Sequence, residues 1–312
     1  MLTDRSGHAP EVSVIVPVRD QRDALAVTMA GFQAQICSES WELIVIDDGS
    51  EYPAEDLVAA HGPVGARTIR LPPSGRAVAR NAGLDAACGS LCLFCDGDRA
   101  PGTGFVARHL SASRSSRPGV VIGGVREFYV SDLTAERDAY IAHAGDGFAA
   151  ASRMARTPPY IRGVLSMFGP DGTTDYAVPW LAFLSGNISY PREIALRFDE
   201  AFDTWGLEHF ELGLRMAEAG IAFKHAPDAI NYHFAHPRPE GFYDNGLEAS
   251  LRVFADRHPY DFVGLIYPFL DGKISLERFE AAVRRERNAP PVHRTTETYY
   301  TQRRRAARYA TT

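Results

Sequence analysis

The feature that most constrains the fold is the alternation of short apolar runs with helical segments in the N-terminal third of the chain. The first runs are rich in Val and Ile, which is typical of buried parallel strands. We expect strands at 12–16, 43–46, 66–71 and 91–95, and helices at 23–33 and 76–87. Strands separated by helices form right-handed crossovers. The sequence therefore predicts an α/β fold with a mostly parallel, doubly wound sheet flanked by helices.

Four aspartates come directly after these expected strands. Asp47 and Asp48 end the second strand, and Asp96 and Asp98 follow the fourth. In doubly wound sheets ligands bind beyond the carboxyl ends of the strands, so we expect the four carboxylates to gather at one edge. Acidic groups would repel a phosphate ligand there unless a divalent cation lay between them. The pattern therefore predicts a bound metal ion.

The composition excludes several classes of protein. The chain has 312 residues, of which 45% are hydrophobic and 23% charged, as in an ordinary globular protein. Its 33 Lys and Arg against 39 Asp and Glu give a net charge of −6, which argues against nucleic acid as a partner. It has no apolar run of about 20 residues and no signal-peptide core at its start. We therefore expect a cytoplasmic enzyme.

Cys92 and Cys95 form a C-x-x-C pair that invites a zinc or redox interpretation. Both lie in the expected strand at 91–95, where side chains three positions apart point to opposite faces of the sheet. The two thiols are therefore expected to pack in the core and not to share an ion.

The second half of the chain has a less regular pattern. The segment 127–177 is rich in Gly, Pro and aromatic residues, and we interpret it as an insertion or a lid. A helix is expected at 206–219, with a strand from 221 after it and further helices at 245–257 and 276–287. Within the first of these helices, Glu211 and Arg215 have the i, i+4 spacing of an ion pair.

Six short motifs, in this order, resemble those of the inverting family 2 glycosyltransferases with the GT-A fold. They are Val14–Pro17, Val45–Ser50, Ala79–Gly83, Asp96–Asp98, Gly186–Asn187 and Trp205–Glu208. The resemblance covers most of the chain and implies transfer of a sugar from a nucleotide diphosphate donor. It also implies a GT-A domain at 1–237, with a nucleotide-binding half at about 11–125 and an acceptor half at about 178–237. A helical extension with a basic tail then follows at 238–312.

On the donor side, the resemblance places Pro17, Val18, Arg19 and Asp48 around the nucleobase. The Asp48 carboxylate would accept a base N–H, which suits uracil and therefore a UDP-sugar. The other donor-binding residues that it implies are Arg80, Asp96, Gly186, Asn187 and Trp205. The alternatives are structural, since Asp and Gly also favour turns and an arginine often forms a surface ion pair.

Asp96-Gly97-Asp98 resembles the family's DxD motif. In an extended segment both carboxylates would face the same way, so that Asp98 and Asp96 could reach one metal ion and the donor ribose. The resemblance adds a histidine ligand, for which His233 is the first candidate and His236 the alternative. Carboxylate and imidazole ligands together favour Mn²⁺, with Mg²⁺ possible. The cation would neutralise the leaving diphosphate.

At the catalytic position the chain departs from the family, which commonly has Glu-Asp where this sequence has Glu208-His209. An inverting enzyme needs a general base opposite the leaving diphosphate. Glu208, in the first turn of a helix, is favoured because the helix dipole keeps it ionised. His209 is the other candidate, since imidazole titrates near neutrality. The alternative function is a catalytically impaired, nucleotide-sugar-binding scaffold or sensor.

Two further interpretations concern partners. A dinucleotide-binding oxidoreductase is excluded because Pro17 to Asp20 contain no G-x-G-x-x-G turn. The acceptor has no motif, so a natural product, a polysaccharide and a peptide all remain open. We expect its pocket to be shaped by 127–177 and by the helices after Pro237. Arginines near the C-terminus suggest peripheral membrane contact, but a solvated tail is the favoured reading.

Overall fold

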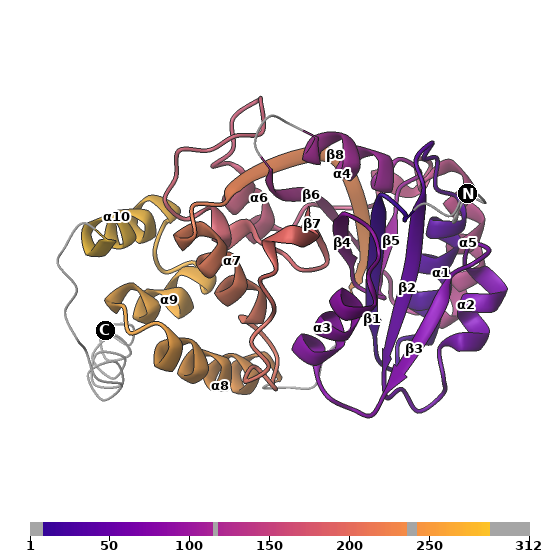
Figure 1. Ribbon diagram of the computed structural model, residues 1–312, viewed down its shortest axis with the longest axis horizontal. Helices are drawn as coiled ribbons and strands as arrows, with labels where there is room; N and C mark the ends of the chain where they lie inside the picture. The colour runs from indigo at the N-terminus through magenta and orange to yellow at the C-terminus, as the bar shows by residue number, and fades with distance from the viewer. Residues whose placement is uncertain (1–8, 115–117, 236–241, 288–312) are drawn as a thin grey trace.

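The computed structural model describes residues 9–114, 118–235 and 242–287, with side chains omitted at 242–245. Within these residues an eight-stranded sheet has the order β3-β2-β1-β4-β7-β6-β8-β5 (Figure 1). The strands are β1 (Val12–Val18), β2 (Trp41–Asp48), β3 (Arg67–Leu71), β4 (Leu91–Cys95), β5 (Arg99–Pro101), β6 (Gly119–Tyr129), β7 (Asn187–Pro191) and β8 (Ala222–Ala235). The α-helices are α1 (Arg22–Gln33), α2 (Glu55–His61), α3 (Arg76–Ala86), α4 (Phe105–Ser113), α5 (Leu133–His143), α6 (Pro159–Leu165), α7 (Glu208–Glu218), α8 (Phe242–Arg257), α9 (Ile266–Leu270) and α10 (Leu276–Arg287).

The N-terminal half is the predicted doubly wound unit. Strands β3, β2, β1 and β4 are parallel neighbours. Every residue of β1 is buried, and its alternate side chains contact opposite layers. Val14 and Val16 pack in a cluster with Leu25 of α1, whereas Ile15 packs with Ala79 of α3 on the other face. The expected strands and the two expected helices of this half are therefore confirmed.

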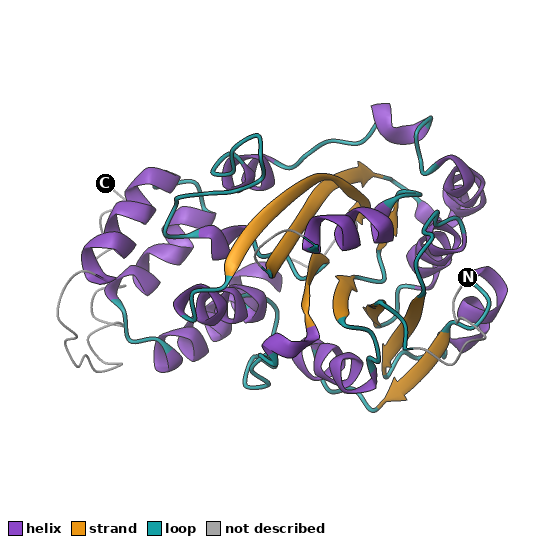
Figure 2. Ribbon diagram, turned by 45° about the horizontal axis from the view of Figure 1, so that its top comes forward, coloured by secondary structure: helices purple, strands orange, loops and turns teal. Residues whose placement is uncertain are grey.

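The other half of the sheet is mixed in direction. Strand β7 is antiparallel to both β4 and β6, while β8 is parallel to β6 and antiparallel to β5. A break in register between Gly123 and Gly124 bends the β6–β8 pair. The helices surround this mixed α/β sheet in Figure 2.

The segment 127–177 is more regular than its sequence indicated. Helix α5 lies beside α1, and the ion pair between Arg137 Nη1 and Asp23 Oδ1 joins them at 3.1 Å. Tyr140 is the one buried residue of α5, so the helix has no apolar stripe by which sequence could reveal it. The ring of Tyr140 packs on Phe128 of β6 and on Phe234 of β8. These aromatic contacts hold α5 against the two strands.

Helices α8, α9 and α10 lie at the end of the molecule opposite β2 and β3 (Figure 1). They do not form a separate core, because their buried side chains belong to the same apolar cluster as α7. The fully buried ring of Trp180 belongs to that cluster and lies within about 6 Å of four phenylalanine rings, those of Phe210, Phe254, Phe262 and Phe279. The expected C-terminal helices are therefore confirmed, and they support the helix that contains Glu208.

The two strand cysteines behave as expected. Cys92 packs in the cluster on one face of β4 and Cys95 in the cluster on the other. Burial raises the pKa of the Cys92 thiol to about 12 and raises that of Cys95 further. Both are reduced in the structure. The C-x-x-C pair is therefore part of the core.

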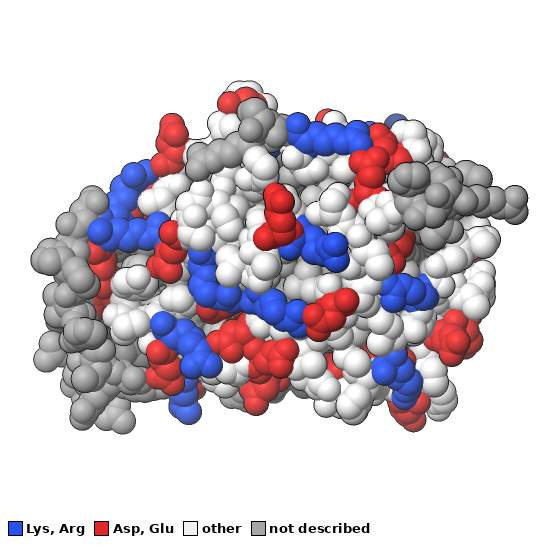
Figure 3. Space-filling model, in the orientation of Figure 1, with Lys and Arg blue, Asp and Glu red and all other residues white. Residues whose placement is uncertain are grey.

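On the face shown in Figure 3, basic and acidic side chains are interspersed without a broad area of one sign. This agrees with the small negative net charge of the chain. Among the described residues, none of the helices combines the length and the apolar character needed to cross a bilayer.

Candidate active site

One cleft of about 1200 Å³ lies beyond the carboxyl ends of the parallel strands. Predicted site residues from both halves of the chain line it. They are Pro17, Val18, Arg19, Asp48, Arg80, Asp96, Asp98, Gly186, Trp205, Glu208, His209 and His233. His236, the alternative histidine, lies outside the described residues, as does the C-terminal arginine tail.

The neighbouring carboxylates Asp47 and Asp48 have different partners. Asp47 is completely buried and accepts the backbone N–H groups of Ser50 and Ala54, so it closes the turn after β2. Asp48 lines the cleft and accepts the N–H groups of Ser74 at 2.7 Å and Gly75 at 3.0 Å. It therefore fixes the loop before α3 at the edge of the cleft.

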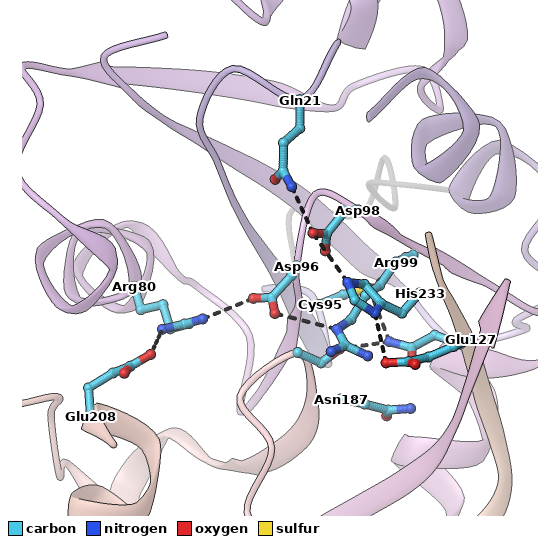
Figure 4. Close-up of polar contacts among 12 residues, drawn as sticks. Gln21, Arg80, Cys95, Asp96, Asp98, Arg99, Glu127, Asn187, Glu208 and His233 are labelled. Carbon is cyan, nitrogen blue, oxygen red and sulfur yellow. Dashed lines mark hydrogen bonds and ion pairs between the residues drawn. The ribbon is translucent and has the colours of Figure 1, made fainter. Parts of the chain in front are cut away.

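Asp96 and Asp98 do not face the same way, which corrects the expectation of an extended segment. Residues 96–98 form a turn, closed by the hydrogen bond from Arg99 N to Asp96 O. A Cβ on Gly97 would lie 2.9 Å from Val18 Cβ, so the turn packs tightly on β1. Because a turn rotates the chain, Asp96 and Asp98 take different partners (Figure 4).

Arg80 joins the two halves of the cleft. Its guanidinium is 3% exposed and donates to Asp96 Oδ1 at 2.9 Å and to Glu208 Oε1 at 3.0 Å (Figure 4). Its Cζ also lies 5.3 Å from the centre of the Phe198 ring. Burial disfavours the cation, but Asp96 and Glu208 outweigh it and raise the pKa of Arg80. The arginine is thus not the surface ion pair that was the alternative.

Glu208 begins α7, and its carboxylate is buried. Its Oε1 accepts from Arg80, while its Oε2 makes no hydrogen bond and lies 3.7 Å from His209 Nδ1. Burial acts to raise the pKa of Glu208, but His209 and Arg80 hold it well below its ordinary value. The side chain of His209 is 20% exposed and lines the cleft. One turn later, Arg215 Nε donates to Glu211 Oε1 at 2.7 Å, as the spacing predicted.

A second polar cluster surrounds Asp98. Its Oδ2 accepts from Gln21 Nε2 at 2.7 Å and lies 3.6 Å from His233 Nε2 (Figure 4). His233 Nδ1 donates to Glu127 Oε1 at 3.0 Å. Burial and Arg99 oppose protonation of the imidazole, but Asp98 and Glu127 raise the pKa of His233 overall. The pairing of β5 and β6 with β8 brings His233 beside Arg99 and Glu127.

Gly186 and Asn187 have separate roles. A Cβ on Gly186 would lie 2.4 Å from both Asp96 Oδ2 and Arg99 Nε, so a larger residue would displace that pair. The Asn187 side chain is fully buried and donates to the carbonyls of Gly124 and Ala229 at the bulge. Asn187 does not line the cleft, because these hydrogen bonds hold its side-chain amide inside the sheet. The predicted donor contact of Asn187 therefore does not agree with its position.

Gln21, Arg99 and Glu127 all line the cleft but were not among the predicted site residues. Arg99 follows Asp98 directly, and its Nε and Nη1 make no hydrogen bond in the structure. Its place next to the D-x-D motif was a usable signal. Gln21 and Glu127 had none, because they meet Asp98 and His233 only through the tertiary fold.

The cleft is also lined by apolar side chains from the segments expected to shape the acceptor pocket. Tyr160 comes from the 127–177 segment, and Leu247 and Leu270 come from α8 and α9. The Tyr160 hydroxyl donates to Leu181 O at 2.8 Å, which holds its ring in place. Trp205 and Phe210 also line the cleft.

No set of three His, Cys, Asp or Glu side chains is arranged to hold a metal ion within 9–114, 118–235 and 242–287. Asp96 faces Arg80 and Arg99, whereas Asp98 faces His233.

Three comparisons with known proteins bear on the family. The family model described as "Glycosyl transferase family 2" matches residues 13–163. The uncharacterized glycosyltransferase YfnE of Bacillus subtilis is 25% identical over 80% of this chain and 70% of its own length. Validoxylamine A glucosyltransferase of Streptomyces hygroscopicus subsp. limoneus is 27% identical over 81% of this chain and 58% of its own length.

Among solved structures, residues 1–349 of Staphylococcus aureus TarS in complex with UDP match with a TM-score of 0.54 at 15% identity. The match covers 82% of this chain and 66% of that chain. At this identity the likeness concerns the fold, and it covers both halves of the sheet. The family model, the fold and the relatives agree, and together they support a glycosyltransferase of family 2 with a GT-A type fold.

Proposed function

We propose that this glycosyltransferase moves a sugar from a UDP-sugar to an acceptor with inversion at the anomeric carbon, assisted by a divalent cation. The main support is that one cleft contains both the strand-end aspartates and the first turn of α7. A base on α7 would therefore face the donor from the side opposite the leaving diphosphate, as direct displacement requires.

The donor side of the cleft suits a nucleoside diphosphate. Pro17, Val18 and Arg19 line it beside Asp48. Each Asp48 oxygen accepts one backbone N–H and keeps a second lone pair, which a base N–H can use. The two Arg99 nitrogens without a hydrogen bond offer donors for the diphosphate. UDP is the first candidate because TarS, which shares the fold, has been solved with UDP.

The donor set around Asp98 fits a divalent cation. An oxygen of Asp98 and His233 Nε2 face each other at 3.6 Å, and Glu127 holds the other nitrogen of the imidazole. A carboxylate behind a histidine in this way is the usual support of a metal-binding imidazole. Mixed oxygen and nitrogen ligands suit Mn²⁺, with Mg²⁺ possible. Such a cation would neutralise charge on the diphosphate, which improves it as a leaving group.

The residues of α7 and α3 would organise the acceptor. Glu208 and His209 stand where the family commonly has its Glu-Asp pair, so the base is one of these two side chains. Arg80 holds Glu208 against Asp96 and thereby fixes the distance between the two sides of the cleft. Tyr160, Trp205 and Leu270 present ring and apolar surface to the bound acceptor.

The proposal is tested by calorimetric titration of the protein with UDP-sugars and GDP-sugars, with Mn²⁺ and with EDTA. UDP-glucose is the first donor because a relative is named a glucosyltransferase. We expect Mn²⁺-dependent binding of a UDP-sugar that Asp98→Asn weakens. Asp138→Asn is the matched control, because that side chain is 83% exposed and remote from the cleft.

Mass spectrometry of a cell extract incubated with the best donor then identifies the acceptor. Absence of binding to every nucleoside diphosphate sugar in the presence of metal would refute the proposal. Binding without transfer across a broad acceptor panel would favour the scaffold or sensor instead.

A further inference from the structure

We infer that His209 is the catalytic base and that Glu208 is its positioning partner, so that this chain uses a carboxylate–imidazole dyad where its family commonly has Glu-Asp. The inference rests on the proposed function, because it assigns the proton transfer within that reaction. It depends on three features of the structure: the partners of Glu208, the placement of His209, and the chemistry that the two allow together.

The first feature is that the Glu208 carboxylate is nearly inaccessible and has one of its two oxygens held by Arg80. Its side chain is 4% exposed, and Oε1 is held by the buried Arg80 guanidinium at 3.0 Å. A general base must come within about 3 Å of the atom that carries the proton it removes. A buried carboxylate that is held by an arginine cannot readily approach an acceptor hydroxyl. Burial acts to raise the pKa of Glu208, but the Arg80 cation acts against it and helps to keep the carboxyl group ionised.

The second feature is the placement of His209. Its side chain is 20% exposed and lines the cleft with Trp205 and Phe210. Its Nδ1 lies 3.7 Å from Glu208 Oε2, a buried oxygen that makes no hydrogen bond. An orphaned carboxylate oxygen gains by accepting an N–H, and a small movement of the ring closes this distance. Glu208 would then hold the proton on Nδ1 and leave Nε2 as the acceptor nitrogen.

The third feature is the resulting proton transfer. Nε2 of His209 takes the proton of the acceptor hydroxyl as the acceptor oxygen bonds to the anomeric carbon of the donor. The bond from that carbon to the β-phosphate oxygen breaks, and its electron pair leaves with the nucleoside diphosphate. Glu208 stabilises the imidazolium that forms, as the carboxylate of a catalytic triad does. Deprotonation of His209 by solvent then restores the enzyme.

The experiment uses water as the acceptor, so it needs no knowledge of the natural acceptor. We would measure release of UDP from the UDP-sugar that binds best, in the presence of Mn²⁺, for the wild type and for His209→Ala. We expect the rate to fall by about 100-fold or more, the usual scale of general base catalysis. The dissociation constant for UDP and Mn²⁺ should stay within about two-fold, because His209 lies outside the donor contacts.

Chemical rescue separates a base from a structural histidine. Free imidazole should restore the activity of His209→Ala at least in part, and His209→Asp should recover activity as the carboxylate that the family commonly has. His61→Ala is the matched control, since His61 ends α2 and does not line the cleft. Urea unfolding of each variant confirms that the fold is retained.

The outcomes distinguish this inference from the proposed function. If the wild type releases UDP and His209→Ala does so equally fast, the dyad is refuted and the transferase proposal stands. Loss of activity in His209→Ala that neither imidazole nor His209→Asp restores would also overturn the dyad. If the wild type neither binds nor cleaves any UDP-sugar, the proposed function itself fails.

Discussion

At one end of the cleft Asp96 and Glu208 share the guanidinium of Arg80, whereas at the other end Asp98 faces the imidazole of His233. Both clusters are built from acidic residues at strand and helix ends, but their counterparts differ. A buried arginine stays charged and leaves no room for a second cation. A histidine can lose its proton and offer a nitrogen to a metal ion. Each cluster contains carboxylates, but its chemistry depends on the side chain that pairs with them. This is Arg80 in the first cluster and His233 in the second.

The largest effect is expected from Arg80→Ala, which would remove the shared partner of the first cluster. It leaves the buried Glu208 carboxylate without its cation, and breaking a buried pair in this way costs about 3–5 kcal/mol. The free energy of unfolding from urea denaturation measures this cost. The matched control is Arg252→Ala, because Arg252 is 57% exposed and pairs with Glu248 at the surface. If the two variants have the same free energy of unfolding, the buried ion pairs of Arg80 do not stabilise the fold.

A smaller effect is expected from Glu127→Gln in the second cluster. The amide accepts the His233 N–H less strongly, so the imidazole becomes a weaker ligand. Loss of such a carboxylate typically lowers metal affinity by about 10- to 100-fold. Titration of the UDP-bound protein with Mn²⁺ measures the affinity, and Glu248→Gln at the surface is the control. Unchanged Mn²⁺ affinity would place the cation elsewhere.

The smallest effect is expected from Gly186→Ala, at the point where the two clusters meet. The added Cβ lies 2.4 Å from Asp96 Oδ2 and Arg99 Nε, which are side-chain atoms that can move. Because they can yield, we expect a stability cost of about 1 kcal/mol, at the low end for overpacking. Affinity for UDP should fall as Asp96 and Arg99 shift. Gly163→Ala is the control, since its Cβ meets nothing within 4 Å. If the two variants bind UDP with equal affinity, the Asp96–Arg99 pair does not contribute to donor binding.

The fold was largely predictable where the pattern was local. The parallel strands and α7 follow from apolar runs and a helical stripe, and Glu211 and Arg215 pair as their spacing indicated. Helix α5 was not predictable, because Tyr140 is its one buried residue. The same limit applies to the D-x-D segment, since the choice between an extended strand and a turn depends on how Gly97 packs on β1.

The site was predictable as a set of residues but not as a set of contacts. Most of the predicted residues line the cleft. Asn187 was predicted to contact the donor because it follows Gly186, which does line the cleft. Its side-chain amide instead donates to the carbonyls of Gly124 and Ala229 at the bulge in the sheet. Gln21 and Glu127 were missed because their partners, Asp98 and His233, are distant in the sequence.

By itself, the sequence determined that this chain is an α/β protein with carboxylates at the ends of its strands, and that it has Glu208-His209 where the family that it resembles commonly has Glu-Asp. These properties follow from side-chain chemistry and from spacing within short segments. Three contacts were decided only by the tertiary structure. Arg80 forms an ion pair with Glu208, Asp96 and Asp98 have different partners, and His233 is hydrogen-bonded to Glu127. Arg80 and Glu208 are 128 positions apart in the chain. Contacts over such separations depend on the packing of whole layers, which local pattern does not encode.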